Sequence, residues 1–185
     1  LFRGCDFEDN RTTPSDFEIS NGNAIFSIDA GYRIDAEYVN PSGPGPLPYY
    51  KHSTIKNFNH GIRATGAGTA HTISVDRVDF EGNMKAVEMV NLDNFRFIRN
   101  NVTVGGVTKN NYNKPNQFGL SVLSSSGFEI EANTFEGNAI GLEPVGVYIE
   151  NSGTESNQVY KNEFKDNAIG QWYNGLNRDQ DPFEG

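Results

Sequence analysis

Short stretches of alternating apolar and polar residues run along the chain, and Gly, Asn, Asp or Ser interrupts them every few positions. In AIFSIDA the alternation predicts that Phe26 and Ile28 point inward from an extended strand, and in ISVDRV it predicts the same for Ile73 and Val75. A helical solenoid needs about 10 residues of 3.6-residue periodicity per unit, which the frequent Gly and Asn prevent. The pattern therefore favours short strands joined by tight turns.

A loose internal repeat accompanies this alternation. Four segments share an apolar residue, a short polar step, Phe, a turn and a second apolar strand: STIKNFNHGIRA, ISVDRVDFEGNMKAVEM, FEIEANTFEGNAIGLE and QVYKNEFKDNAIGQW. The segment FRFIRNNVTVGG fits them with Val102 in the Phe position. The repeat predicts one column of stacked residues, formed by Phe58, Phe80, Val102, Phe135 and Phe164. Asn follows three residues after Phe in three coils, at Asn83, Asn138 and Asn167.

Such a unit cannot bury its apolar side alone, so successive units are expected to stack about 4.8 Å apart and share one interior. The repeated Asn suits both a left-handed corner and side-chain hydrogen bonding along the stack. We therefore expect an all-β fold, a right-handed parallel β-helix of about six coils, in which residues 1–185 form a single domain. A β-sandwich is the structural alternative, although it does not explain the recurring Phe-x-x-Asn step.

The segment NTFEGNAIGL resembles the coil pattern of the parallel β-helix repeat family found in pectate-lyase-like bacterial secreted proteins. The resemblance extends over residues 53–172 and more loosely over residues 1–36. It implies the β-helix architecture and an extracellular or cell-surface location. It does not select an activity, because this superfamily contains lyases, hydrolases, epimerases, adhesins and stalks.

Three stretches break the repeat and are predicted as loop insertions: residues 37–50, 107–117 and 143–157. Loops on a rigid scaffold commonly carry binding groups, and aromatic rings beside Asn and Asp can stack on sugars. The aromatic candidates for ligand contact are Tyr38, Tyr49, Tyr50, Trp172 and Tyr173. We favour a structural interpretation over ligand contact, in which the tyrosines cover the apolar edges of loops against the coil.

The proposed coil alignment places Arg63, Glu88, Ser121, Glu143 and Trp172 in one outward column. A catalytic interpretation would use Glu88 as acid or base and Arg63 to hold a substrate carboxylate, with Glu143 on the same face. The resemblance implies a Lys or Arg base near calcium-binding carboxylates for a uronate lyase, and Lys56, Lys85 and Arg63 are the residues available. A cross-strand ion pair between Arg63 and Glu88 is the favoured, structural interpretation.

The composition and charge of the chain limit which partners and cofactors it is expected to bind. The chain has 15 Lys and Arg against 24 Asp and Glu, a net charge of -9, which argues against a nucleic-acid partner. No apolar run is long enough for a membrane span, and the single Cys5 makes no intrachain disulfide. The histidines are expected to be ordinary exposed residues. No cofactor is expected, although Asn177, Asp179 and Asp181 have the alternate spacing of a calcium loop, with Pro182 where an EF-hand needs Gly.

Two functions follow from these observations. The first is a non-catalytic β-helix module of an exported or cell-surface bacterial protein, acting as a stalk, adhesin segment or glycan-contacting unit. The alternative is a polysaccharide lyase or glycoside hydrolase of the pectate-lyase-like class acting on acidic glycans. Because the sequence begins inside a strand pattern, we expect it to be part of a longer protein. Neighbouring polypeptide or a partner protein is expected to cover at least one open end of the helix.

Overall fold

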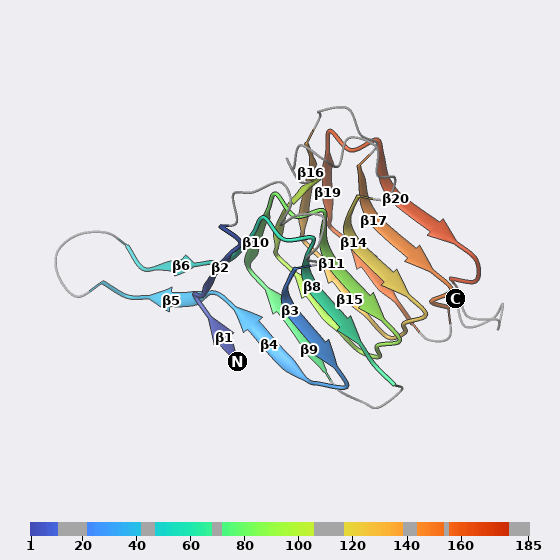
Figure 1. Cartoon of the computed structure of the whole chain (residues 1–185), viewed down its shortest axis with the longest axis horizontal. Coiled ribbons are helices and arrows are strands. Elements are labelled where there is room, and N and C mark those ends of the chain that lie inside the picture. Colours follow the sequence, from blue (N-terminus) through green and yellow to red (C-terminus); the bar gives the residue numbers. More distant parts are fainter. Residues whose placement is uncertain are drawn as a thin grey trace.

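The chain winds into a parallel β-helix with three six-stranded sheets (Figure 1). The computed structural model describes residues 1–10, 22–41, 47–67, 72–105, 117–138, 144–153 and 156–177. Within these residues it contains strands and turns without any helix. Every strand of the three sheets pairs in parallel with the equivalent strand of the next coil. The all-β fold and the six-coil β-helix predicted from the sequence are confirmed.

Each coil contributes one strand to each sheet. The first sheet contains β1 (Phe2–Arg3), β4 (Tyr32–Asp35), β9 (Ile73–Asp76), β12 (Arg96–Ile98), β15 (Glu129–Glu131) and β18 (Gln158–Tyr160). The second contains β2 (Asp6–Glu8), β7 (Ser53–Lys56), β10 (Val78–Glu81), β13 (Asn101–Val104), β16 (Thr134–Gly137) and β19 (Glu163–Lys165). The third contains β3 (Asn23–Ile28), β8 (His60–Thr65), β11 (Lys85–Val90), β14 (Phe118–Leu123), β17 (Val145–Glu150) and β20 (Ile169–Asn174).

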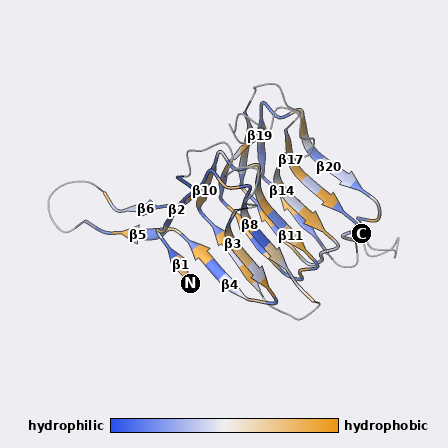
Figure 2. Cartoon of the chain, in the orientation of Figure 1, coloured by the Kyte–Doolittle hydropathy of each residue, from blue (hydrophilic) through white to orange (hydrophobic). Residues whose placement is uncertain are grey.

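The interior is a single narrow core shared by all three sheets. Apolar and polar segments alternate along the strands in Figure 2, as expected when one face of each strand is buried. Ile73 and Val75 are buried, which confirms the inward positions predicted for them. The largest fully buried side chains of the described residues are phenylalanines, namely Phe80, Phe95, Phe97, Phe128 and Phe135. Aromatic rings from successive coils are thus the bulkiest side chains of the core, and aliphatic residues such as Ile34, Ile55 and Leu120 fill the space around them.

The predicted aromatic column lies in the second sheet. Phe80 pairs with Val102, Val102 with Phe135, and Phe135 with Phe164. The rings of Phe135 and Phe164 are stacked, with centroids 5.3 Å apart and planes 8° apart. This spacing is close to the separation of neighbouring strands. The sequence repeat therefore predicted the correct alignment of these four residues.

Phe58 does not belong to this column, contrary to the prediction. Ile55 pairs with Phe80, and Phe7 pairs with Ile55 on the other side. Phe58 follows β7 in the corner after Asn57, whose φ of 65° turns the chain. Ile55 and Phe58 are both apolar and lie three positions apart, so either could be aligned with Phe80 from the sequence. The geometry of the corner places Ile55 in the column.

The inward face of β3 was also assigned wrongly. Ile25 and Ser27 pair with the buried positions of β8, whereas Phe26 and Ile28 point outward and are 56% and 60% exposed. Alternation defines two faces of a strand without stating which one is buried. In this first coil the outward face is the more apolar, so the pattern pointed to the wrong side.

Buried amides run along the corner between the first and second sheets. The amides of Asn100 and Asn133 each donate to the Oδ1 atom of the next residue in the series, which ends at Asn162, and both distances are 2.9 Å. The same oxygens accept the backbone N–H groups of Asn100 and Asn133. Polar groups are thereby satisfied inside a corner that is closed to water.

Two of the Asn residues that follow Phe form the predicted hydrogen bonds along the stack. Asn83 donates to the carbonyl of Ile55 and Asn167 to that of Phe135, each one coil below. Their side chains therefore bond along the stack. The left-handed conformation falls elsewhere, for example at Arg77 with a φ of 55°.

Two of the three predicted insertions can be compared with the structure. Residues 37–50 include β5 (Glu37–Val39) and β6 (Tyr49–Lys51), an antiparallel ribbon that projects from the coils at the left of Figure 1. The stretch 143–157 is not an insertion as a whole, since β17 within it pairs regularly with β14 and β20. Nearly all of 107–117 lies outside the described residues. Cover of an open end by another chain stays a prediction.

Candidate functional site

The outward face of the third sheet holds the predicted column of functional residues. Arg63 of β8 pairs with Glu88 of β11, and Glu88 pairs with Ser121 of β14. The column continues through Tyr148 of β17 to Trp172 of β20. Four of the five residues assigned to this column from the sequence therefore share one face.

Glu143 was assigned to this column wrongly. Tyr148 occupies the position between Ser121 and Trp172, and Glu143 lies outside the described residues. The coils differ in length at the corner before the third sheet, and the sequence carries no marker for the residue at which the strand resumes. Tyr148 was missed for the same reason.

Three cationic or ionisable side chains surround Glu88, and with it they form the Glu88 cluster. Lys85 Nζ lies 2.7 Å from Oε1, Arg63 Nε lies 2.9 Å from Oε2, and His60 Nε2 lies 3.8 Å from Oε2. Glu88 is only 6% exposed although it points outward. His60 was expected to be an ordinary exposed residue, but it is partly buried beside this carboxylate.

The cluster holds its charges in a fixed pattern. Burial alone would raise the pKa of Glu88, but the hydrogen bond from Lys85 and the surrounding positive charges lower it below its ordinary value. Burial is the main reason that the pKa of His60 is lowered, and it outweighs the attraction of Glu88. At neutral pH Glu88 is therefore an ionised carboxylate beside a neutral imidazole. A general acid needs a raised carboxyl pKa, so this environment disfavours that role for Glu88.

A second group of side chains lies further along the same face, on β17 and β20. Tyr148 donates its hydroxyl to Glu150 Oε2 at 2.9 Å, and Asn174 donates to the Tyr148 oxygen and to Glu150 Oε1. The ring of Trp172 meets that of Tyr148 edge to face, with centroids 5.2 Å apart. We refer to Tyr148, Glu150, Trp172 and Asn174 as the Trp172 patch.

Only part of this aromatic surface is open. The rings of Phe118 and Tyr148 stack face to face, 5.0 Å apart and 21° from parallel, so they cover each other. Trp172 is 43% exposed at the end of the row. An apolar ring next to a carboxylate, a carboxamide and a hydroxyl is an arrangement that suits hydroxylated ligands.

Tyr173 does not join Trp172 in one aromatic spot. It pairs with Ile149, a buried residue, and so occupies the inward side of β20 at the last coil. Its hydroxyl donates to Gln171, two residues away on the same side. Adjacent residues of a strand face opposite ways, which separates this predicted pair.

The three remaining aromatic candidates lie on the β5–β6 ribbon and are exposed. Tyr38 and Tyr50 pair across the ribbon with ring centroids 5.4 Å apart. The guanidinium of Arg77 lies 4.3 Å above the centre of the Tyr50 ring. Tyr49 pairs with Val39 in the same ribbon. One face of Tyr50 is thus engaged with the coil, as the structural interpretation of these tyrosines expects.

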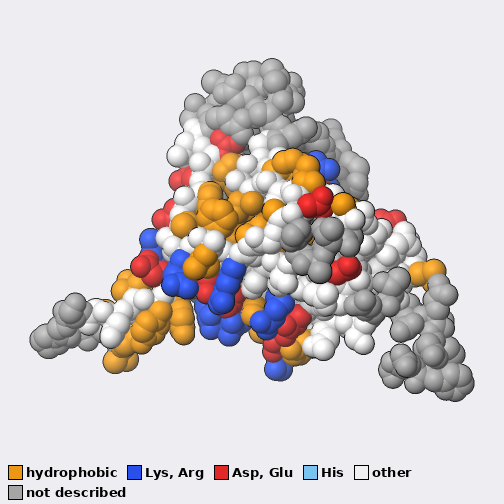
Figure 3. Space-filling model, turned by 90° about the horizontal axis from the view of Figure 1, so that it is seen from below, with side chains coloured by type: hydrophobic (Ala, Val, Ile, Leu, Met, Phe, Trp, Pro, Cys, Tyr) orange, Lys and Arg blue, Asp and Glu red, His pale blue; other side chains and the backbone are white. Residues whose placement is uncertain are grey.

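Arg77 also belongs to an ion-pair group on the first sheet. Asp76 is buried and accepts hydrogen bonds from Arg99 Nε at 2.8 Å, from Arg99 Nη2 at 2.5 Å and from Arg77 Nη1 at 3.1 Å. Figure 3 shows basic and acidic side chains intermixed beside the ribbon. The arginines here are paired with carboxylates, which limits their availability to an external anion.

Asn177 has a structural role, because its side chain bonds to the backbone of the neighbouring coil. Its Oδ1 accepts the backbone N–H of Ser152 at 3.1 Å, continuing a series in which Ser125 accepts from Leu92 and Ser152 from Ser125. Asp179 and Asp181 lie outside the described residues. Among the described residues, no group of three or more His, Cys, Asp or Glu side chains could hold a metal ion.

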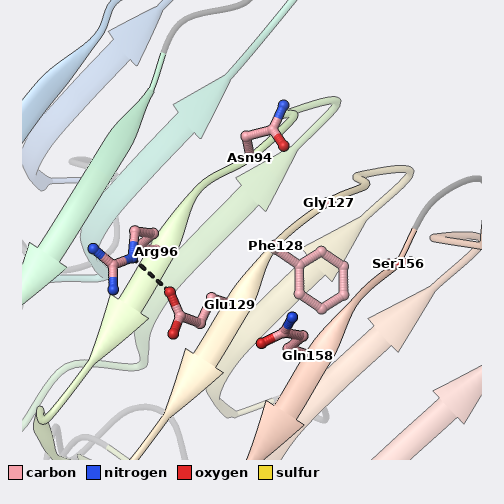
Figure 4. A pocket seen from close by; sticks show the side chains of 7 residues that line it. All are labelled: Asn94, Arg96, Gly127, Phe128, Glu129, Ser156 and Gln158. Carbon is pink, nitrogen blue, oxygen red and sulfur yellow. Dashed lines mark hydrogen bonds and ion pairs between the residues drawn. The ribbon is translucent and has the colours of Figure 1, made fainter.

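A pocket opens on the outer side of the first sheet, near the start of β12, β15 and β18 (Figure 4). Its volume is about 300 Å³, and Arg96 and Glu129 form an ion pair in its wall. Sequence reasoning missed this site. The repeat places these residues at equivalent strand positions, but they carry no motif that distinguishes them from ordinary surface charges.

No protein-family model matches the chain, and neither does any curated protein or solved structure. In the part of the chain that the structure describes, no helix has the length and apolar character needed to cross a membrane.

Proposed function

We propose that this chain is a non-catalytic parallel β-helix module of an exported or cell-surface protein, related to the pectate-lyase-like superfamily, and that it contacts glycan through the Trp172 patch. The coil pattern NTFEGNAIGL and the three-sheet architecture support the relationship. The observation that carries the glycan contact is the exposed Trp172 ring on the same face as the pair Glu150 and Asn174, two residues further along the strands.

The chemistry of the patch fits a sugar ring. A pyranose presents an apolar C–H face, which packs on an indole, and hydroxyls at its rim, which exchange hydrogen bonds with carboxylate and carboxamide groups. Glu150 and Asn174 lie at the ends of their strands and pair with each other across β17 and β20. A rigid sheet holds these groups in place before the ligand arrives, which reduces the entropy cost of binding.

The Glu88 cluster supports a role other than catalysis. Its carboxylate is compensated by Lys85 and Arg63, which leaves it poorly suited to release or accept a proton near neutral pH. Glycoside hydrolysis uses two carboxylates about 5 to 10 Å apart, and the ionic partners of Glu88 within the described residues are all basic side chains.

A glycan array followed by calorimetric titration of the best ligand tests the proposal. Trp172→Ala should weaken binding about tenfold or more, the effect of removing an exposed aromatic contact. Tyr173→Ala is the matched control, because Tyr173 is the neighbouring aromatic residue, is 50% exposed and faces the opposite side of β20. Equal effects of the two substitutions, or no glycan bound by the wild-type protein, would overturn the proposal.

The alternative is a lyase or hydrolase that acts on acidic glycans with Arg63, Lys85 and Glu88 in its groove. Their convergence on one outward face favours it. Unsaturated-uronate absorbance on acidic polysaccharides, with and without calcium, distinguishes the two functions. Turnover that is lost in Glu88→Ala would establish the enzyme and reject the non-catalytic module.

A further inference from the structure

The pocket on the first sheet lies on a different face from the Trp172 patch. Figure 4 shows Arg96, Glu129 and Gln158 side by side on three neighbouring strands. Asn94 and Ser156 come from the corners that precede β12 and β18. Its volume of about 300 Å³ is at the lower end of the range of about 300 to 1,000 Å³ for small-ligand sites.

The ion pair in its wall is held rigidly. Arg96 Nε donates to Glu129 Oε2 at 2.5 Å, and Tyr160 donates its hydroxyl to the other carboxylate oxygen, Oε1, at 3.0 Å. The paired strands β12 and β15 carry Arg96 and Glu129 at equivalent positions. Both oxygens of Glu129 thus have a donor, and the pair adds hydrogen-bonding groups to the pocket without adding net charge.

The other lining groups are uncharged. Asn94 and Gln158 contribute carboxamides, which both donate and accept, and Ser156 contributes a hydroxyl. Phe128 borders the pocket, but its ring is only 1% exposed and stacks on Phe95 in the core, with centroids 5.2 Å apart. The surface open to a ligand therefore consists mainly of hydrogen-bonding groups.

We infer that this pocket is a second carbohydrate site, which takes a neutral hexose unit in preference to a uronic acid. Neutral hydroxyls can both donate to Glu129 and accept from Arg96 or a carboxamide. The carboxylate group of a uronic acid could only accept hydrogen bonds, and it would meet the already compensated guanidinium of Arg96 and the negative charge of Glu129. Such a site goes beyond the proposed contact at Trp172.

The two sites border the same corner of the helix. Glu150 of the Trp172 patch ends β17, and the chain then passes through Ser152 to Ser156 and Gln158 of the pocket. Along the stack, the backbone N–H of Ser125 donates to Ser152 Oγ. Within each coil, the hydroxyls of Ser125 and Ser152 donate to the carbonyls two residues earlier, which stiffens the corner. Two weak sites at one rigid corner would raise the affinity for a branched or multivalent glycan above that of either site.

Protein NMR on the whole chain tests the inference. The ¹⁵N-labelled protein is titrated with methyl glycosides of glucose, galactose and mannose, and with the matching glucuronoside and galacturonoside. Saturable shifts of the side-chain amide signals of Asn94 and Gln158 are expected with a neutral glycoside. Arg96→Gln and, as a milder change, Gln158→Ala should each weaken that binding about tenfold.

Arg33→Gln is the matched control, since Arg33 lies in the same outward column two coils away and is likewise paired with a carboxylate, that of Asp35. It should leave the affinity unchanged. In Trp172→Ala the pocket response should persist, so failure of one site is distinguishable from failure of the other. Tighter binding of the uronates, no saturable response, or equal losses in Arg33→Gln and Arg96→Gln would overturn the inference.

Discussion

Asn100 and Asn133 lie one coil apart in the buried corner between the first and second sheets, and the amide of Asn100 donates to Oδ1 of Asn133 at 2.9 Å. The backbone N–H of Asn100 shares that acceptor, and Asn133 itself donates to the carbonyl of Phe97. Asn133 also donates to Oδ1 of Asn162, so its side chain satisfies polar groups of three residues, Asn100, Phe97 and Asn162.

Replacing Asn133 by Ala should lower the free energy of unfolding by about 2 to 4 kcal/mol, because several buried polar groups lose their partners at once. Urea denaturation followed by circular dichroism measures the change. Asn101→Ala is the control on a neighbouring residue, where an exposed amide bonds to Asp79. A loss no greater than in that control would contradict the structural role of the amide series.

Phe135→Ala should be destabilising by about 3 to 5 kcal/mol, because it removes a fully buried ring and leaves a cavity between coils. Its stacking on Phe164 and its contact with Phe97 are lost together. The outward-facing Phe26 provides the comparison, and Phe26→Ala should change stability by less than about 1 kcal/mol. Denaturant midpoints of the two variants report the difference, and similar midpoints would contradict the assigned register.

Acid should weaken the fold through His60. Burial lowers the pKa of His60 below its ordinary 6.5, so the unfolded chain takes up this proton at a higher pH than the folded one. The contribution to stability is complete above pH 6.5 and is lost progressively as the pH falls below that value. Glu88, whose folded pKa lies below 4.5, adds a further loss at lower pH.

Urea titrations between pH 7.5 and pH 5, a range of about one unit or more either side of the ordinary histidine pKa, measure this effect. His60→Gln should flatten the dependence, and His52→Gln should retain it because His60 remains in place. An unchanged slope in His60→Gln would show that the dependence comes from another group.

Asp76→Asn should cost about 1 to 3 kcal/mol, since charge-assisted hydrogen bonds from Arg99 and Arg77 to a buried carboxylate are weakened. Glu163→Gln removes an exposed pair with Lys165 and should change stability by no more than about 0.5 kcal/mol. Thermal and urea denaturation of both variants compare a buried with an exposed ion pair. Equal effects would mean that burial of Asp76 does not strengthen its contacts.

The candidate site was only partly visible in the sequence. Arg63 and Glu88 could be aligned because their strands follow corners of equal length, with three residues between β7 and β8 and three between β10 and β11. The placement of Glu143 failed because the next coil resumes at β17 after a corner of different length, which brings Tyr148 into the column instead. Trp172 and Tyr173 are neighbours in the chain, yet β20 places them on opposite faces.

By itself the sequence determined the class of fold and most of the stacked core. Recurring Phe, Asn and Gly at related positions leave few ways to bury the apolar residues other than stacked coils. The tertiary structure decided the register at each corner, the burial of Glu88 among basic side chains, and the pocket around Arg96 and Glu129. These depend on corner lengths and on contacts between residues from different coils, and local alternation of polarity contains no information about either.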